Sequence, residues 1–336
     1  LLLCALPVAS GSGPEVEIVA VGDILLDRGV ARRIEREGTR AVFSRVRDTV
    51  SGADLSFGNL ECPVTIRCER GSQRIAFRAR PRYTEALIDA GFDILSLANN
   101  HSMDCGGAGL LETIRNLNAS GLRSSGAGRT RKEAEAPVLL NVKGIRIASL
   151  SFTMIAPPTG RPPNDNEPSV AIASRSSVES AIVSARRDAD VVIVSLHWGV
   201  EYSSRPSAEQ VSLAHAAVEA GADVVLGHHT HTLAGLEVIR RRSGTGGTRY
   251  ALVAYSLGNF VFDSPRWLGK RVTESAVLRF RLSRAGVVKA ELLPVVLEDY
   301  LPRPANSTEA RSILSRLATL SAELNTEMTN GQISLR

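Results

Sequence analysis

Residues 222–231 read ADVVLGHHTH, a short apolar run followed by Gly and then by four polar residues, three of them His. Four further runs share this plan, in which a stretch rich in Val, Ile or Leu precedes Gly, Asn or His and then a helical pattern: EIVAVGD (17–23), DLSFGNLE (54–61), DILSLANNH (93–101) and ADVVIVSLHWG (189–199). Near-continuous apolar strands that alternate with helices predict a sheet covered by helices on both faces. The expected fold class is therefore α/β.

The remaining secondary structure follows from periodicity and turn residues. Helices are predicted at 82–90, 108–120, 177–187, 208–220 and 312–327. A second group of strands, expected to be antiparallel at the sheet edge or in a second sheet, is predicted at 137–152, 248–260, 272–283 and 287–298. Residues 284–286 read as the turn of a hairpin between the last two strands.

The composition is that of a soluble globular chain with a basic balance. Its 336 residues include 40 Lys and Arg against 35 Asp and Glu, a formal net charge of +5. The positive charge is almost all arginine and is spread along the chain, without the basic patch interleaved with aromatics that typifies nucleic-acid binding. A nucleic-acid partner is therefore not expected, whereas an acidic substrate is compatible with the charge.

The N-terminal segment LLLCALPVASGSGPE has an apolar run followed by small residues, as at the end of a secretory signal or membrane anchor. Export is the favoured interpretation, and a truncated cytoplasmic start is the alternative. Three cysteines follow this segment. Either Cys62 and Cys68 close a short loop and leave Cys105 unpaired, or all three are unpaired.

Five of the six histidines lie in motifs at predicted strand ends, together with carboxylate and amide side chains. The carboxyl ends of the strands in such sheets meet at one crevice. The residues expected to converge there are Asp23, Glu61, Asn100, His101, His197, His229 and His231. Each motif alone has a structural explanation as a turn, a helix cap or a core histidine, but their joint position at strand ends favours a site.

This mixture of nitrogen and oxygen donors suits two divalent ions such as Mn, Fe or Zn better than Ca or Mg. The carboxylate of Glu61 is expected to bridge the ions. Two such ions activate a water molecule and clamp the oxygens of a phosphoryl group. His101, next to Asn100, is then expected to orient the phosphate or to protonate the leaving oxygen.

The ordered motifs GDILLDR, GNLECPVT, SLANNHSMDCGGAGL, SLHWGVEY, GADVVLGHHTH and YSLGNFVF resemble the bacterial capsule-synthesis protein CapA (PgsA) family, a branch of the calcineurin-like metallophosphoesterase superfamily. The resemblance spans residues 16–265. It implies a four-layer α/β/β/α sandwich and a role in synthesis, export or release of poly-γ-glutamate capsule or a related anionic cell-envelope polymer. It also implies a location at the outer face of the cytoplasmic membrane, in the cell envelope or outside the cell.

The resemblance also assigns residues and domain limits. The positions that match metal ligands are Asp23, Glu61, Asn100, His197, His229 and His231, and the catalytic positions are His101 and Asn100. Three further family positions, expected to bind substrate, are Arg28, Glu201 and Asn259. Residues 1–14 are expected to be a signal or anchor remnant and linker, 15–300 the CapA-like metallophosphoesterase domain, and 301–336 a C-terminal helical extension packed on the same domain.

The chain departs from the superfamily pattern in the first metal motif. The superfamily has Asp-x-His there, whereas Leu25 stands two residues after Asp23. The leading prediction is a two-metal phosphoesterase-type hydrolase that acts on an anionic polymer or another phosphoester. Two alternatives stay open: a non-catalytic, polymer-binding accessory subunit of a membrane synthase, which Leu25 favours, and a general secreted phosphodiesterase or nucleotidase.

Overall fold

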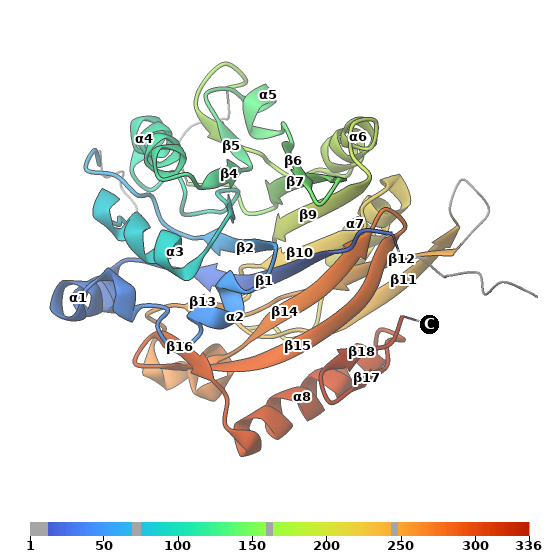
Figure 1. The fold of residues 1–336 in the computed structure, drawn as a ribbon. Coiled ribbons are helices and arrows are strands. Elements are labelled where there is room, and N and C mark those ends of the chain that lie inside the picture. Colours follow the sequence, from blue (N-terminus) through green and yellow to red (C-terminus); the bar gives the residue numbers. More distant parts are fainter. Residues whose placement is uncertain (1–12, 69–74, 159–163, 243–247, 336) are drawn as a thin grey trace, which may run out of the picture.

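Two β-sheets stack face to face and carry helices on their outer faces in the computed structural model (Figure 1). The structure describes residues 13–68, 75–158, 164–242 and 248–335. The predicted signal or anchor remnant therefore falls almost wholly outside the described residues.

The larger sheet has a parallel half and an antiparallel half. Its strand order is β17-β18-β15-β14-β1-β2-β3-β4, and β13 pairs with β1 while β16 pairs with β15. Strands β1 to β4 and β13 are parallel, and β14 runs antiparallel to β1. The strands are β1 (Val16–Ile24), β2 (Leu55–Leu60), β3 (Ile94–Ser96), β4 (Arg123–Ser125), β13 (Asn259–Val261), β14 (Glu274–Ser283), β15 (Gly286–Glu298), β16 (Leu301–Pro304), β17 (Met328–Thr329) and β18 (Gln332–Ile333).

The smaller sheet has the order β11-β12-β10-β9-β7-β6, with four parallel central strands and an antiparallel strand at each edge. Its strands are β6 (Val138–Val142), β7 (Ile145–Thr153), β9 (Val191–His197), β10 (Val224–His228), β11 (Leu236–Arg242) and β12 (Thr248–Ala254). Strands β5 (Ala127–Gly128) and β8 (Ser169–Val170) form a separate pair.

The helices follow or precede these strands. They are α1 (Arg28–Glu37), α2 (Arg47–Ser51), α3 (Thr84–Ala90), α4 (Gly106–Ala119), α5 (Arg131–Ala134), α6 (Arg175–Ala185), α7 (Ala208–Ala220) and α8 (Ser307–Ala322), with 3₁₀ turns at Thr39–Ala41, Pro81–Tyr83, Arg266–Leu268 and Lys270–Val272. Within the described ranges, none of these helices combines the length and the apolar character that a bilayer crossing needs.

Alternation along the strands creates three layers of core. In β1, Val19 and Val21 pack with the helices on the outer face of the larger sheet, whereas Ile18 and Ala20 face the second sheet. The other face of the second sheet packs on α6 and α7. Successive side chains of a strand point to opposite faces, so β1 serves two cores at once. This arrangement confirms the predicted four-layer α/β/β/α sandwich.

Two segments that were predicted as single strands each form two strands in the structure. The segment 137–152 is a hairpin, because Lys143 and Gly144 turn with φ of 51° and 79°. The segment 248–260 crosses between the sheets: β12 pairs with β10, and after Gly258 (φ 67°) β13 pairs with β1. The predicted hairpin at 284–286 is confirmed by the β14–β15 pairing.

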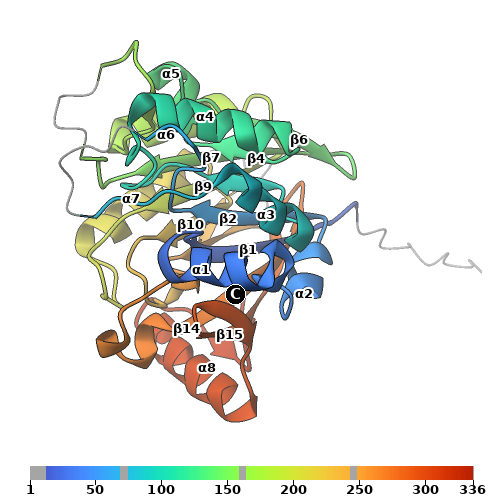
Figure 2. The ribbon, with the colours of Figure 1, turned by 90° about the vertical axis from the view of Figure 1, so that its left-hand side faces the viewer.

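The C-terminal helix begins five residues before its predicted start. Asn306 caps α8 by accepting hydrogen bonds from the N–H groups of Thr308 and Glu309. The Glu309 carboxylate in turn accepts a hydrogen bond from Asn306 N. This capping box fixes the helix start. Ile313 and Leu317 then pack into the core between the sheets. Figure 2 shows α8 at the end of the molecule opposite α4 and α6.

Both interpretations of the cysteines were wrong. Cys68 is bonded to Cys105 across 37 positions of sequence, and Cys62 is free. Cys62 is fully buried at the end of β2 in the core under the outer helices, where its Sγ accepts from Leu26 N. The loop that follows carries Cys68 to the start of α4, so the loop path, not the sequence distance, decides the pairing.

Candidate metal centre

The ends of β1, β2, β9 and β10 deliver the predicted site residues to one place. Asp23 of β1 is in register with Asn59 of β2 and with Asn259 of β13. His197, the last residue of β9, is in register with His228 of β10. Both sheets therefore contribute donors, and stacking of the sheets brings the two sets together.

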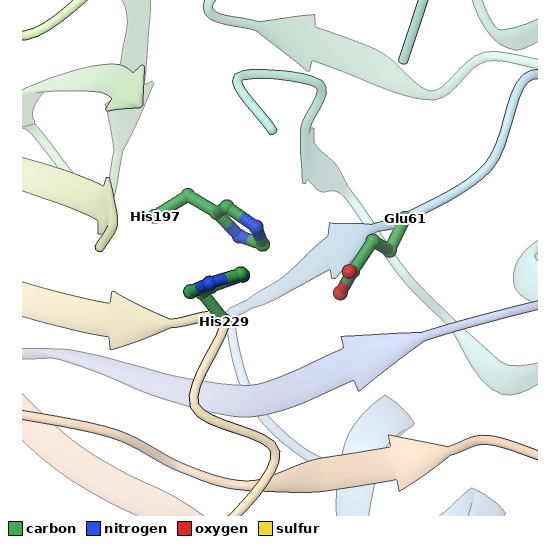
Figure 3. Close-up of side chains that lie close together, drawn as sticks. All are labelled: Glu61, His197 and His229. Carbon is green, nitrogen blue, oxygen red and sulfur yellow. The ribbon is translucent and has the colours of Figure 1, made fainter. Parts of the chain in front are cut away.

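The side chains form two adjoining sets of donors. Glu61, His197 and His229 make one set, and Asp23, Glu61 and His231 make the other; within each set the donor atoms lie within 4.8 Å of one another. All five residues are buried. Figure 3 shows the carboxylate of Glu61 directed toward the rings of His197 and His229, whose centroids are 4.7 Å apart. Glu61 is common to both sets.

Two buried polar atoms of the donor sets have no hydrogen-bond partner in the described part of the chain and could bind a cation. Among the described residues, Oε1 of Glu61 and Nδ1 of His229 are buried and have no hydrogen-bond partner. Leaving such atoms unsatisfied is costly, and each can donate a lone pair to a cation. The donors combine imidazole nitrogen with carboxylate oxygen, which suits a borderline divalent ion. The residues present therefore fit a metal centre.

Burial sets the protonation of the first donor set. Burial lowers the pKa of His197 well below its usual value and lowers the pKa of His229 to about 4. Both rings are consequently neutral near pH 7, which is the form that binds metal. Burial, together with the negative charge of Asp23, raises the pKa of Glu61 well above its usual value. The carboxylate thus needs a positive charge beside it to remain ionised.

The second donor set already contains opposite charges. Burial opposes ionisation of Asp23, but the neighbouring rings of His228 and His231, 3.4 and 3.3 Å from its carboxylate oxygens, outweigh it and hold its pKa well below the usual value. Burial also opposes protonation of His231, yet the charges of Glu61 and Asp23 raise its pKa to about 9. In the metal-free protein a proton on His231 therefore neutralises part of the charge of these carboxylates.

The backbone at the site is unusual. His229 and His231 have φ of 90° and 57°, in the left-handed region that side chains rarely adopt. Gly22 and Gly227 lie beside the site where strands approach closely: an added Cβ would be 1.9 Å from the carbonyl oxygen of Gly258 and 2.0 Å from that of Tyr255, respectively. Strained or crowded backbone of this kind clusters at functional sites.

Asn59 belongs to the site although the sequence analysis did not assign it a role. Its Nδ2 lies 2.8 Å from Oδ1 of Asp23 and 3.4 Å from Nδ1 of His197. Its Oδ1 accepts a hydrogen bond from Asn99, at 3.1 Å. The signal was the two-residue period of a strand, which places Asn59 on the same face as Glu61.

Asn100 and His101 lie at the edge of the donor sets. Oδ1 of Asn100 is 2.8 Å from Nε2 of His197, and Asn100 is outside the two carboxylate and histidine sets. The His101 side chain is 16% exposed, and its Nδ1 lies 2.8 Å from Oδ2 of Asp104. Asp104 also accepts from Phe77 N. The sequence analysis missed Asp104, although a carboxylate three residues after a candidate catalytic histidine was a usable signal.

The three expected substrate-binding residues have different surroundings. Asn259 is buried and its Oδ1 is 2.9 Å from Nδ1 of His231, so it orients a donor. Arg28 is half-exposed and lies over the ring of Phe77, at 5.9 Å. Glu201 is exposed and its charge acts on both Glu61 and His229. Arg28 and Glu201 thus lie at the rim of the site.

His228, which directly precedes the donor His229 at the end of β10, is fully buried. Its Nδ1 lies 3.4 Å from Oδ1 of Asp23. Leu25, which replaces a histidine of the superfamily pattern, is also fully buried and packs in the core beneath the outer helices. It offers no donor to the centre.

Known proteins resemble this chain over most of its length. The family model described as bacterial capsule synthesis protein PGA_cap matches residues 17–264. The chain is 33% identical to the capsule biosynthesis protein CapA of Bacillus anthracis, over 93% of this chain and 75% of that protein. It is also 33% identical to the PGA biosynthesis protein CapA of Bacillus subtilis, over 88% and 76%.

Solved structures share the fold. A hypothetical protein from Thermus thermophilus matches with a TM-score of 0.51 and 18% identity, over 86% of this chain and all of that one. The NAD nucleotidase of Haemophilus influenzae matches with a TM-score of 0.50 and 11% identity, over 93% and 58%. The fold is thus of the metallophosphoesterase type. The extent of the family match and the identity to both CapA proteins show that this chain belongs to the bacterial capsule synthesis protein family.

Proposed function

We propose that this protein is a two-metal hydrolase of the phosphoesterase type that takes part in synthesis, export or release of poly-γ-glutamate or a related anionic cell-envelope polymer. The observation that carries the proposal is the position of Glu61, whose carboxylate belongs to both donor sets. A carboxylate within reach of two neighbouring ligand sets could bridge a pair of ions. The names of the two CapA relatives support the link to capsule polymer.

The proposed ligands divide between the ions. His197 and His229 would hold one ion, Asp23 and His231 the other, and Glu61 both; Asn100, which contacts His197, would join the first set. Bound divalent ions, of which Mn, Fe and Zn fit the donors, would supply an activated water and charge stabilisation for phosphoryl transfer.

The other side chains supply positioning and proton transfer. His101 is fixed by Asp104 on its Nδ1 side, which leaves Nε2 to give a proton to the leaving oxygen. Arg28, half-exposed at the rim, offers positive charge to an anionic substrate. Asn259 holds the ring of His231 in place. Arg28, Glu201 and Asn259 are therefore proposed to position substrate and ligands.

The disulfide supports the proposed export. Disulfides persist in oxidising compartments outside the cytoplasm and are rare within it. The bond between Cys68 and Cys105 thus agrees with a location in the cell envelope or outside the cell. Membrane synthase subunits are proposed as partners there, together with the anionic polymer.

A non-catalytic accessory subunit is the second candidate. It is favoured by Leu25, because the loss of a histidine removes one nitrogen donor from the centre. A probable polyglutamine synthesis accessory protein of Mycobacterium tuberculosis is 25% identical to this chain, over 76% of each protein. In this role the same pocket would bind polymer without turnover.

One experiment separates the two candidates. Metal content is measured by elemental analysis, and hydrolysis of an aryl phosphodiester is measured with and without Mn²⁺, for the wild type, His229→Ala and His215→Ala. His215 is the matched control, since it lies on α7 and contacts Glu237. About two metals per chain and turnover lost only in His229→Ala support the hydrolase. No turnover with any ion supports the accessory subunit.

A further inference from the structure

A basic groove opens beside the metal centre, between α1 and the chain that leads into α3. It has a volume of about 510 Å³, and its charged walls are Asp27, Arg32, Glu35, Arg36, Arg78 and Arg80. Four arginines thus face two carboxylates. None of the four belongs to the donor sets of the metal centre.

A short series of contacts links the groove to His101, the proposed proton donor. The ring centroids of Phe77 and His101 lie 4.3 Å apart, and the guanidinium carbon of Arg28 lies 5.9 Å from the Phe77 centroid. Asp27, which precedes Arg28, and Arg78, which follows Phe77, both line the groove. Arg78 N donates a hydrogen bond to Asp27 Oδ2, at 2.8 Å. The groove therefore begins next to the residues that contact His101.

The two carboxylates of the groove are already engaged. Asp27 caps α1 by accepting from Arg28 N at 2.7 Å, and it also accepts from Arg78 N. Glu35 accepts from Arg82 and Tyr83, which lower its pKa, and pairs with Arg80 at 3.1 Å. Among the described residues, neither carboxylate forms an ion pair with Arg32 or Arg78.

Two guanidinium groups remain available. The Arg32 side chain is 73% exposed, and its one carboxylate neighbour in the described part of the chain, Asp263, is 3.8 Å away. Arg78 is exposed, and its guanidinium group forms no ion pair with a carboxylate among the described residues; its contact with Asp27 is through the backbone N–H. Arg36 is also exposed but pairs with Glu37 at 2.7 Å. Excess positive charge is therefore concentrated at Arg32 and Arg78.

We propose that this groove is a second binding site that holds a polycarboxylate chain, a segment of poly-glutamate, while another part of the chain reaches the metal centre. This proposal rests on the proposed action on an anionic polymer. The guanidinium fork matches the geometry of a carboxylate. Each contact is weak in water, but contacts along one chain reinforce one another because the second becomes intramolecular. Affinity therefore depends on the length of the chain.

The test is a binding measurement with fluorescein-labelled poly-glutamate, followed by anisotropy at low salt. The variant Arg32→Gln/Arg78→Gln is compared with Arg187→Gln/Arg311→Gln, which removes the same charge at exposed arginines after α6 and on α8. The groove variant is expected to bind about tenfold more weakly and the control within about twofold of wild type. Equal losses in both variants would overturn the proposal, since general charge would then explain binding.

Two further arms test the kind of ligand. Unlabelled long poly-glutamate is expected to compete well, and glutamate monomer at the same carboxylate concentration poorly; equal competition would overturn a chain-binding groove. Inorganic polyphosphate is the other probe. If the groove variant loses affinity for polyphosphate and keeps its affinity for poly-glutamate, the polycarboxylate assignment is wrong.

Binding at the groove and hydrolysis at the metal centre are tested by separate measurements. His229→Ala removes a donor of the metal centre and is expected to retain binding of long poly-glutamate in the anisotropy assay, because the groove is outside the donor sets. Loss of polymer affinity in His229→Ala with none in the groove variant would place all binding at the metal centre and overturn the groove. Circular dichroism of each variant confirms that the fold is intact.

Discussion

The imidazole of His101 places its Nδ1 2.8 Å from Oδ2 of Asp104, a carboxylate that is itself buried and also accepts the N–H of Phe77. The carboxylate therefore fixes which ring nitrogen carries the proton toward Asp104 and directs the other nitrogen away from it. This relationship gives the ring of His101 one orientation, with Nε2 directed away from Asp104 and available to carry the proton that the proposed reaction delivers to the leaving oxygen.

Asp104→Asn is expected to lower kcat for an aryl phosphodiester by about 10²- to 10⁴-fold, because the amide no longer stabilises a protonated His101. KM is expected to change little. Steady-state kinetics across pH provide the measurement, and metal content must match wild type, since Asp104 is outside the donor sets. An unchanged kcat, or a loss that follows loss of metal, would rule out this positioning role.

Glu61→Gln and His197→Ala are expected to differ in the number of ions they retain. Glu61 belongs to both donor sets, whereas His197 belongs to one. Elemental analysis is expected to find almost no metal in the Glu61 variant and about one ion per chain in the His197 variant. His215→Ala serves as the control with full occupancy. Similar metal content in the two variants would contradict a shared carboxylate.

The disulfide is expected to contribute about 2–4 kcal/mol to the free energy of unfolding. In a Cys4→Ser background, unfolding without reductant should expose one reactive thiol, that of Cys62, and reduction should add the two thiols of Cys68 and Cys105. Denaturant unfolding of the oxidised protein and of Cys68→Ser/Cys105→Ser gives the energy. Three thiols without reductant would show that the bond is absent.

Gly22→Ala is expected to destabilise the fold by more than about 3 kcal/mol, since the new methyl group would collide with the carbonyl of Gly258. The collision would also separate β1 from β13 beside Asp23. Thermal unfolding of the variant is compared with Gly13→Ala, where an added Cβ meets no atom within 4 Å. Equal melting temperatures would show that the strands have room to part.

Periodicity predicted the layers of this fold because each central strand buries both faces. The run 189–199 was expected to be a strand before a histidine, and β9 ends at His197. Boundaries were less accurate where local chemistry ended an element. The strand predicted at 222–231 stops at His228, since the left-handed φ of His229 cannot continue a strand.

Residues that act through others were harder to predict than the donors. Asn59 was not predicted as a site residue: its contact with Asp23 depends on the register of β1 and β2, and its contact with His197 depends on how the two sheets stack. The Cys68–Cys105 bond depends on the path of a loop. Local sequence carries neither kind of information, whereas strand ends rich in His and Asp signal donors directly.

The position of β1 links assembly of the site to the order in which the chain is made. Val16 in β1 pairs with Leu282 in β14, so one of the two long neighbours of this central strand is synthesised near the end, while the other, β2, follows soon after it. Asp23 on this strand also contacts a residue far along the chain, since its Oδ2 lies 3.3 Å from Nδ1 of His231. Topologies dominated by such distant contacts fold slowly. Since metal binds a folded site, the ion is selected where folding finishes, and a chain exported before folding would take its metal from outside the cytoplasm.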